Sequence, residues 1–131
     1  MSTKNVTTMN TNQVAAQLVS MCRQGKFREA LEALYGANIV SVEGFDQPDG
    51  TARECRGLDA VRAKTERFLG VHDIHAVTVS EPFLALDKFA VRFDVDLTFK
   101  PTGARNKFGE IAVYTVHEGK IIREEFLTLV G

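Results

Sequence analysis

The chain has 131 residues, of which 44% are hydrophobic, and its 16 basic and 17 acidic residues give a formal net charge of −1. This length suits one domain, and the composition can supply a buried core without disulfide staples. The balanced charge excludes the basic surface expected of a protein that binds nucleic acid or an anionic membrane. The longest apolar runs are too short to span a bilayer.

The first eleven residues are polar and rich in Thr and Asn. They lack the apolar run of a secretory signal peptide, so the sequence predicts a cytoplasmic protein. We expect a flexible tail over residues 1–11 and one domain over residues 12–131. The two cysteines are isolated and form neither a metal-binding pair nor a disulfide framework. Cys22 is expected to be buried on a helix, and Cys55 to be free near a loop.

Three helices are predicted in the first half of the chain, where apolar residues repeat at helical spacing over residues 14–22, 27–35 and 58–69. The side chain of Thr11 or Asn12 is expected to cap the first helix. Gly36 would close the second, and Gly70 would end the third.

The rest of the chain is rich in strand-forming residues. Strands are predicted over residues 39–45, 54–56, 75–86 with a break at Pro82, 89–99, 108–116 and 120–129. Glu118 and Gly119 supply a hairpin turn between the last two. Helices followed by a run of antiparallel strands argue for an α+β fold, with the helices on one face of a curved sheet.

The clearest strand signal lies in residues 89–99, where apolar and polar residues alternate without exception. The odd-numbered residues are apolar and are assigned to the core. Asp94 and Asp96 occupy the other face, which turns them toward solvent or toward a second copy of the chain.

Three short segments resemble the nuclear transport factor two-like superfamily, and within it the SnoaL-like proteins. They are Leu31-Glu-Ala-Leu-Tyr35 leading into Asn38-Ile-Val-Ser-Val-Glu43, then Gly57-Leu-Asp-Ala-Val61, and finally Glu110-Ile-Ala-Val-Tyr114 followed by Gly119-Lys-Ile-Ile-Arg-Glu-Glu-Phe126. The resemblance implies a cone-shaped α+β half-barrel, in which three helices pack on a curved, mainly antiparallel sheet. It also implies a small hydrophobic ligand in the cone, no cofactor, and a homodimer formed through the open sheet face.

The chain departs from the ketosteroid isomerases of this superfamily. They carry an aspartate base after a Val-Glu pair, whereas here Val42-Glu43 is followed by Gly44. Their oxyanion-binding tyrosine lies on the first helix, and residues 12–24 contain no tyrosine. Steroid isomerisation by that mechanism is therefore not expected. SnoaL-like cyclases instead use an acid on the final strand, where this chain has Glu124 and Glu125.

The candidate catalytic residues are Glu110, Tyr114 and Glu125, with Glu43 in reserve. A carboxylate in an apolar cavity has a raised pKa, which suits it to proton transfer near neutral pH. Tyr114 would donate to an oxyanion. Adjacent strand residues point to opposite faces, so at most one of Glu124 and Glu125 enters the cone.

Each acid also has a purely structural interpretation. Arg92 or Arg123 would neutralise Glu110 across a strand, and His117 would be exposed beside its hairpin turn. His72 and His75 are too few, and wrongly spaced for a strand, to form a metal site. No metal or cofactor is expected.

Two functions remain open. One is cofactor-free proton transfer on a small hydrophobic molecule, as in an isomerase, cyclase or dehydratase. The alternative is a non-catalytic homodimeric or ligand-binding module, whose interface would include Arg92, Asp94, Asp96 and Thr98.

Overall fold

The computed structural model describes residues 8–130, which form three helices and one sheet of seven strands. The helices are α1 (Thr11–Arg23), α2 (Phe27–Leu34) and α3 (Leu58–Val71). The strands are β1 (Tyr35–Val42), β2 (Glu54–Arg56), β3 (His72–Val79), β4 (Phe83–Leu84), β5 (Lys88–Phe99), β6 (Ala104–His117) and β7 (Lys120–Thr128).

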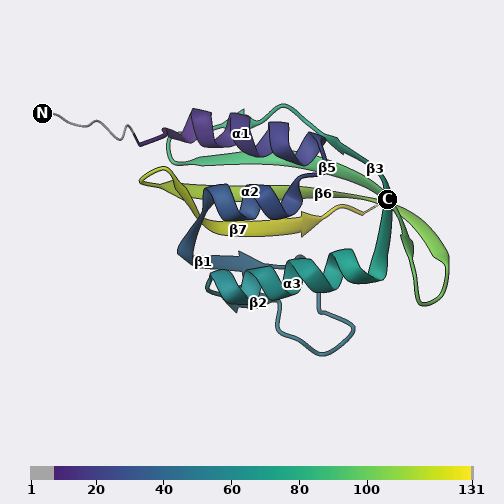
Figure 1. Ribbon diagram of the computed structural model, residues 1–131. Helices are drawn as coiled ribbons and strands as arrows, with labels where there is room; N and C mark the ends of the chain where they lie inside the picture. The colour runs from purple at the N-terminus through teal and green to yellow at the C-terminus, as the bar shows by residue number, and fades with distance from the viewer. Residues whose placement is uncertain (1–7, 131) are drawn as a thin grey trace, which may run out of the picture.

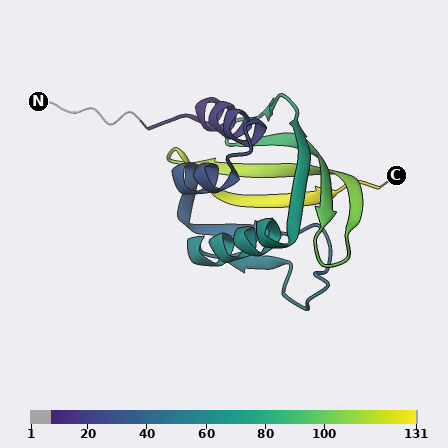
Figure 2. The same cartoon turned by 45° about the vertical axis from the view of Figure 1, so that its right-hand side comes forward.

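The strands lie in the order β2-β1-β7-β6-β5-β3, with β4 paired to β5. All neighbours are antiparallel except β1 and β7, which run parallel and are joined by a long connection through α3 and the other strands. The helices lie on one face of the sheet, and the sheet curves around them (Figure 1, Figure 2). This arrangement confirms the predicted α+β cone.

The face of the sheet under the helices, called here the inner face, carries the core. Phe89, Val91, Phe93 and Leu97 of β5 are all buried on it, as their alternation predicts. Their even-numbered neighbours lie on the opposite, outer face. There Arg92 donates to Asp94, and Arg105 donates to Asp96.

The hairpin between β6 and β7 turns at Glu118 and Gly119, as predicted. Both residues have positive φ, 50° and 77°. Two consecutive residues of this kind match the right-handed twist of the flanking strands.

Several predicted boundaries are wrong. The side chain of Asn10, not of Thr11 or Asn12, caps α1 by accepting from the Gln13 amide, and the Gln13 side chain accepts from the Asn10 amide in return. The second helix ends at Leu34, and Gly36 already belongs to β1, where it lies against the backbone of β7. Pairing with β7 therefore overrides the local signal for a helix cap.

The third helix ends later, and the strands β3 and β6 start earlier, than predicted. Helix α3 continues through Gly70 to Val71, and β3 follows at once with His72, three residues before the predicted start of that strand. Strand β6 starts at Ala104 rather than at Phe108, because residues 104–107 pair with the end of β5.

The predicted tail over residues 1–11 lies partly outside the described residues, which begin at Thr8; Thr11 already belongs to α1. Both cysteines are free, and Cys22 is buried as expected. Within residues 8–130, no helix combines the length and the apolar character needed to cross a membrane.

Candidate functional site

A buried carboxylate, Glu124 of β7, lies at the centre of the inner face. Only 3% of its surface is exposed. The sheet register places Ser41 of β1 on one side of it and Tyr114 of β6 on the other. The Tyr35 hydroxyl donates to Glu124 Oε1, and the Ser41 hydroxyl donates to Oε2 at 2.7 Å. A buried carboxylate needs such donors to remain charged.

Lys64 of α3 extends this set of contacts toward solvent. Its ammonium donates to Ser41 Oγ at 2.5 Å and lies 2.7 Å from Glu43 Oε1. The same nitrogen lies 5.5 Å from the centre of the Phe126 ring. The Lys64 and Glu43 side chains are 20% and 21% exposed, so water reaches this end. Tyr35, Ser41, Glu43, Lys64 and Glu124 are called the Glu124 network below.

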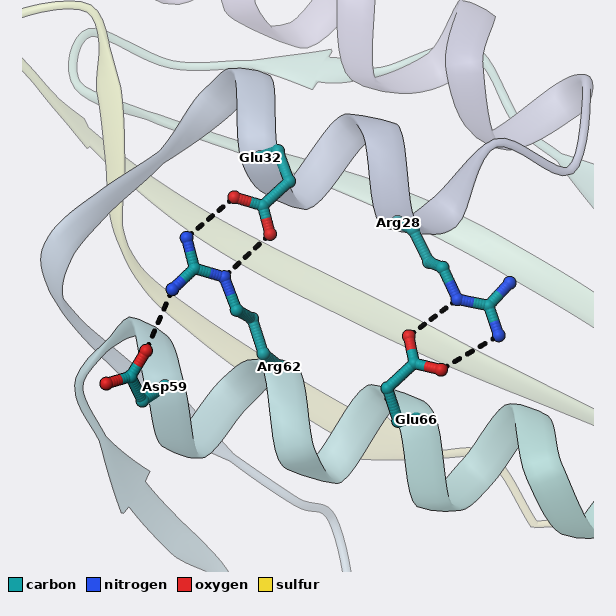
Figure 3. A network of polar contacts seen from close by, with 5 residues as sticks. All are labelled: Arg28, Glu32, Asp59, Arg62 and Glu66. Carbon is teal, nitrogen blue, oxygen red and sulfur yellow. Dashed lines mark hydrogen bonds and ion pairs between the residues drawn. The ribbon is translucent and has the colours of Figure 1, made fainter.

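Helix α3, which carries Lys64, is joined to α2 by ion pairs on their exposed edges (Figure 3). Arg28 donates to both oxygens of Glu66, and Arg62 donates to both oxygens of Glu32. Arg62 also donates to Asp59 within α3. These contacts join the helix that carries Lys64 to α2 at the surface.

Tyr114 lies at the inner end of the site. Its side chain is 2% exposed and stacks on Phe89, with 4.9 Å between the ring centres. Burial, and then the charge of Glu124, raise the pKa of Tyr114 well above the usual range of a tyrosine. The same two causes raise the pKa of Tyr35. Both phenols are therefore neutral donors at neutral pH.

Glu110 is the carboxylate best suited to exchange a proton. It lies on the same face of β6 as Tyr114 and is partly buried. Burial, and then the charges of Glu43 and Glu124, raise its pKa to about 7, against an opposing effect of Lys64. Among residues 8–130 its carboxylate has no hydrogen-bond or ion-pair partner.

The arginines expected to neutralise Glu110 are engaged elsewhere. Arg92 pairs with Asp94 on the outer face, and the Arg123 guanidinium lies 3.6 Å from Glu125. Neither arginine therefore forms an ion pair with Glu110 that would lower its pKa.

Burial also raises the pKa of Glu124, but three neighbouring groups lower this pKa, whereas only Lys64 lowers that of Glu110. The charge of Lys64 and the hydrogen bonds from Tyr35 and Ser41 lower this pKa, while the charge of Glu43 raises it. The groups that act on the pKa of Glu124 thus come from β1, from the residue that follows it and from α3.

The adjacent acids Glu124 and Glu125 do point to opposite faces, and Glu124 is the inner one. The Glu125 side chain is 44% exposed beside Arg123. Glu125, which the sequence put forward as catalytic, is therefore not brought together with Glu43, Glu110 and Tyr114. Tyr35, Ser41 and Lys64 were not identified from the sequence, because none of them lies on the acid-rich strands of the last third of the chain.

The histidines lie outside this site. His75 Nε2 is 2.7 Å from Thr98 Oγ1, His72 Nδ1 is 2.8 Å from the Phe68 carbonyl, and His117 is exposed beside Glu118. No group of three or more His, Cys, Asp or Glu residues with metal-binding geometry occurs in the described part of the chain.

Two surface hollows lie away from Glu110. The first, of about 380 Å³, is lined by the junction of α1 and α2, by Leu69 and by β3. The second, of about 350 Å³, lies between residues 8–12 and the β6–β7 hairpin. Cys22 lines the first hollow and is also close to Glu124, whose charge adds to the effect of burial in raising the pKa of Cys22 to about 12.

Comparison with known proteins identifies relatives of the same architecture. A candidate SnoaL-like polyketide cyclase from Mesorhizobium loti is 32% identical, with a TM-score of 0.83 over 90% of this chain and 98% of that one. A nuclear transport factor two-like protein from Burkholderia thailandensis is 20% identical, with a TM-score of 0.77 over 92% of each chain. A candidate isomerase from Bacillus subtilis is 16% identical, with a TM-score of 0.72 over 89% of this chain and 84% of that one.

The last two likenesses show the fold alone, because their identities are low. No curated protein sequence matches the chain. The model of the SnoaL-like domain family matches residues 9–128, which include every element of the fold and all of the Glu124 network. The chain therefore belongs to the SnoaL-like domain family.

Proposed function

We propose that the protein binds a small, largely apolar molecule on the inner face, beside Glu43, Lys64 and Glu110, and moves a proton on it without a cofactor. The observation that carries this proposal is Glu110, a partly buried carboxylate without a partner among the described residues, with a pKa of about 7. A base with this pKa is half ionised at neutral pH and can both accept and return a proton. Isomerisation, cyclisation and dehydration all need such a group.

The neighbours of Glu110 supply the other parts of this chemistry. Removing a proton next to a carbonyl places negative charge on the carbonyl oxygen, and a positioned donor stabilises that charge. Lys64 is the proposed donor at the outer end of the site, where its side chain is partly exposed. Tyr114 is the proposed donor for the inner end of the ligand. Glu43 holds the Lys64 ammonium in place at 2.7 Å.

The apolar part of the ligand would contact aromatic side chains. Phe93 of β5 is paired with Glu110 in the sheet register, and Phe126 lies next to the Lys64 ammonium. Ligand sites of this kind combine an apolar lining with a few polar groups that fix the orientation. The similar protein that is 32% identical is named as a candidate polyketide cyclase, a reaction class of the proposed type.

Hydrogen exchange at carbon tests the proposal without a known substrate. 2-Tetralone, an apolar ketone with acidic C–H groups, is incubated with the protein in deuterated buffer, and loss of its α-proton signal is followed by NMR. We expect Glu110→Gln to slow the protein-dependent exchange by a factor of roughly 10². Glu110 must be ionised to accept the proton, so the wild-type rate rises with pH through about 7 and then levels off.

Glu125→Gln is the matched control, because it removes a carboxylate from the outer face of the neighbouring strand. It is expected to leave the exchange rate unchanged. Equal rates for the wild type and Glu110→Gln would contradict a catalytic role of Glu110.

A second candidate function is that of a homodimeric interaction module. The observation that favours it is on the outer face, where Leu127 is 47% exposed and is paired across the sheet with Ile111, which in turn is paired with Arg92. A central apolar strip flanked by charged residues is typical of an interface between protein subunits.

A further inference from the structure

In the Glu124 network, the Ser41 hydroxyl lies between the Lys64 ammonium and the Glu124 carboxylate, and it has only one proton to donate. Ser41 is fully buried. Its Oγ accepts from the Lys64 ammonium at 2.5 Å and donates to Glu124 at 2.7 Å. Because an ammonium group can only donate, the contact with Lys64 obliges the single Ser41 proton to point at another acceptor, which is Glu124.

This constraint determines which hydrogen bonds the Glu124 carboxylate accepts. With Lys64 in place, Glu124 accepts one hydrogen bond from Tyr35 and one from Ser41, one on each oxygen. Two donors favour the carboxylate over the carboxylic acid. Without Lys64, Ser41 Oγ is free to accept, and a protonated Glu124 can donate to it.

We infer that Lys64 is a positioning residue that sets, through the hydroxyl orientation of Ser41, whether Glu124 is a carboxylate or a carboxylic acid. When the Lys64 ammonium leaves Ser41, Glu124 takes up one proton from solvent and turns it toward Ser41 Oγ. The ammonium keeps its own protons. This goes beyond the proposed function, in which Glu124 has no role.

The consequence is a link between the exposed and the buried ends of the site. Lys64 is shared between Ser41 and Glu43, and an oxygen anion arriving beside Glu43 competes for the same ammonium. Drawing Lys64 outward then raises the proton occupancy of Glu124, which lies deeper in the fold.

Other charged and titratable groups around Glu124 act on it at the same time. Glu43 follows the end of the same strand as Ser41, and Cys22 lies on α1. The remaining groups close to Glu124 are Tyr114 and Glu110 of β6 and Cys55 of β2. Among the groups whose effect on Glu124 is identified, Lys64 is the only cation.

A double-mutant cycle read by NMR tests the inference. The carboxyl carbons of glutamate are labelled with ¹³C, the Glu124 signal is assigned by its loss in Glu124→Gln, and its pKa is measured in wild type, Lys64→Met, Ser41→Ala and the double variant. We expect Lys64→Met to raise the pKa of Glu124. In the Ser41→Ala background the same substitution is expected to have a clearly smaller effect, because the hydroxyl that transmits it is gone.

The alternative is that Lys64 acts on Glu124 by charge alone. In that case Lys64→Met raises the pKa equally with and without Ser41, and the inference is overturned. An unchanged pKa in Lys64→Met overturns it as well. Lys64→Gln repeats the cycle with a polar side chain, in the event that methionine beside Glu43 prevents folding.

Arg67→Met is the matched control. Arg67 is an exposed cation on the same helix and has no contact with the Glu124 network. Removal of the Arg67 charge is expected to leave the pKa of Glu124 unchanged. Because the cycle needs no ligand, it can succeed or fail independently of the ketone exchange experiment.

Discussion

Gly44 follows Glu43 just beyond β1 and touches the backbone of β7. A Cβ atom at this position would lie 2.6 Å from Thr128 Oγ1 and 2.9 Å from both the Phe126 carbonyl oxygen and the Thr128 amide nitrogen. Two of these three atoms belong to the backbone and cannot move without shifting β7. An aspartate, which the resemblance to ketosteroid isomerases places here, therefore does not fit, and Glu43 is the carboxylate left at this end of β1.

We expect Gly44→Ala to lower the free energy of unfolding by about 1–3 kcal/mol, because the added methyl group overpacks the contact with β7. Gly70→Ala is the control, since a Cβ atom added to Gly70 in α3 would have nothing within 4 Å. That substitution should stabilise the protein by about 0.5–1 kcal/mol. Urea unfolding of both variants checks the pair, and destabilisation by Gly70→Ala or none by Gly44→Ala would contradict this account.

At the scale of a single element, α3 is the least deeply anchored helix. Of its 14 residues only Val61 is buried, whereas α1 buries five residues. Its position depends on Lys64, which reaches the inner face, and on the ion pairs with α2 (Figure 3). Elements with few buried contacts open most readily in the native state.

We expect Glu66→Arg to speed amide hydrogen exchange in α3 severalfold, because it replaces the ion pair with Arg28 by two facing guanidinium groups. Exchange in α1 should not change. The charge-swapped double variant, Arg28→Glu with Glu66→Arg, should restore slow exchange in α3. Mass spectrometry of peptic fragments follows all three proteins, and equal exchange in the single and double variants would show that this ion pair does not hold α3.

At the scale of the whole molecule, the two faces of the sheet have different chemistry. The inner face carries the core and the Glu124 network, while the outer face carries paired charges around Leu127 and Ile111. If two copies meet through the outer face, each inner face stays free, so dimerisation and ligand binding do not exclude each other.

We expect Arg92→Glu to reduce the solution mass of a dimer to that of a monomer, because it replaces the cation of the Arg92–Asp94 pair by a further acid next to the exposed apolar strip. Light scattering provides the mass. Arg53→Glu makes the same change of charge in the loop between β1 and β2, which lie at the other end of the strand order from β5, and should leave the mass unaltered. A dimer that persists in Arg92→Glu would count against this interface.

Much of the fold is encoded locally. The strict alternation in residues 89–99 is enough to assign every side chain of β5 to a face, since the side chains of a strand have a period of two. The same period places Glu110 and Tyr114 together. The local signal for a helix end is misleading at two glycines. At Gly36 the pairing of β1 with β7 sets the boundary, and at Gly70 helix α3 continues directly into β3.

The choice between the acids of β7 depends on tertiary structure. Strict alternation from the buried Ile121 would place Glu125 on the inner face. The register between β6 and β7 shifts at Val116, and this shift brings Glu124 inside instead. A bulge of this kind is a property of the pair of strands and leaves no reliable mark in either sequence.

The order of helices and strands in the sequence predicts the fold class. The period of two within single strands predicts the core face of β5 and puts Glu110 and Tyr114 on the same face of β6. The contacts of Tyr35 and Ser41 with Glu124, and of Lys64 with Ser41, instead depend on the tertiary structure. Ser41 is 83 residues away from Glu124 in the chain and reaches it through the parallel pairing of β1 with β7. Alternation within a strand is the same whichever neighbour it pairs with, so no local pattern specifies that contact.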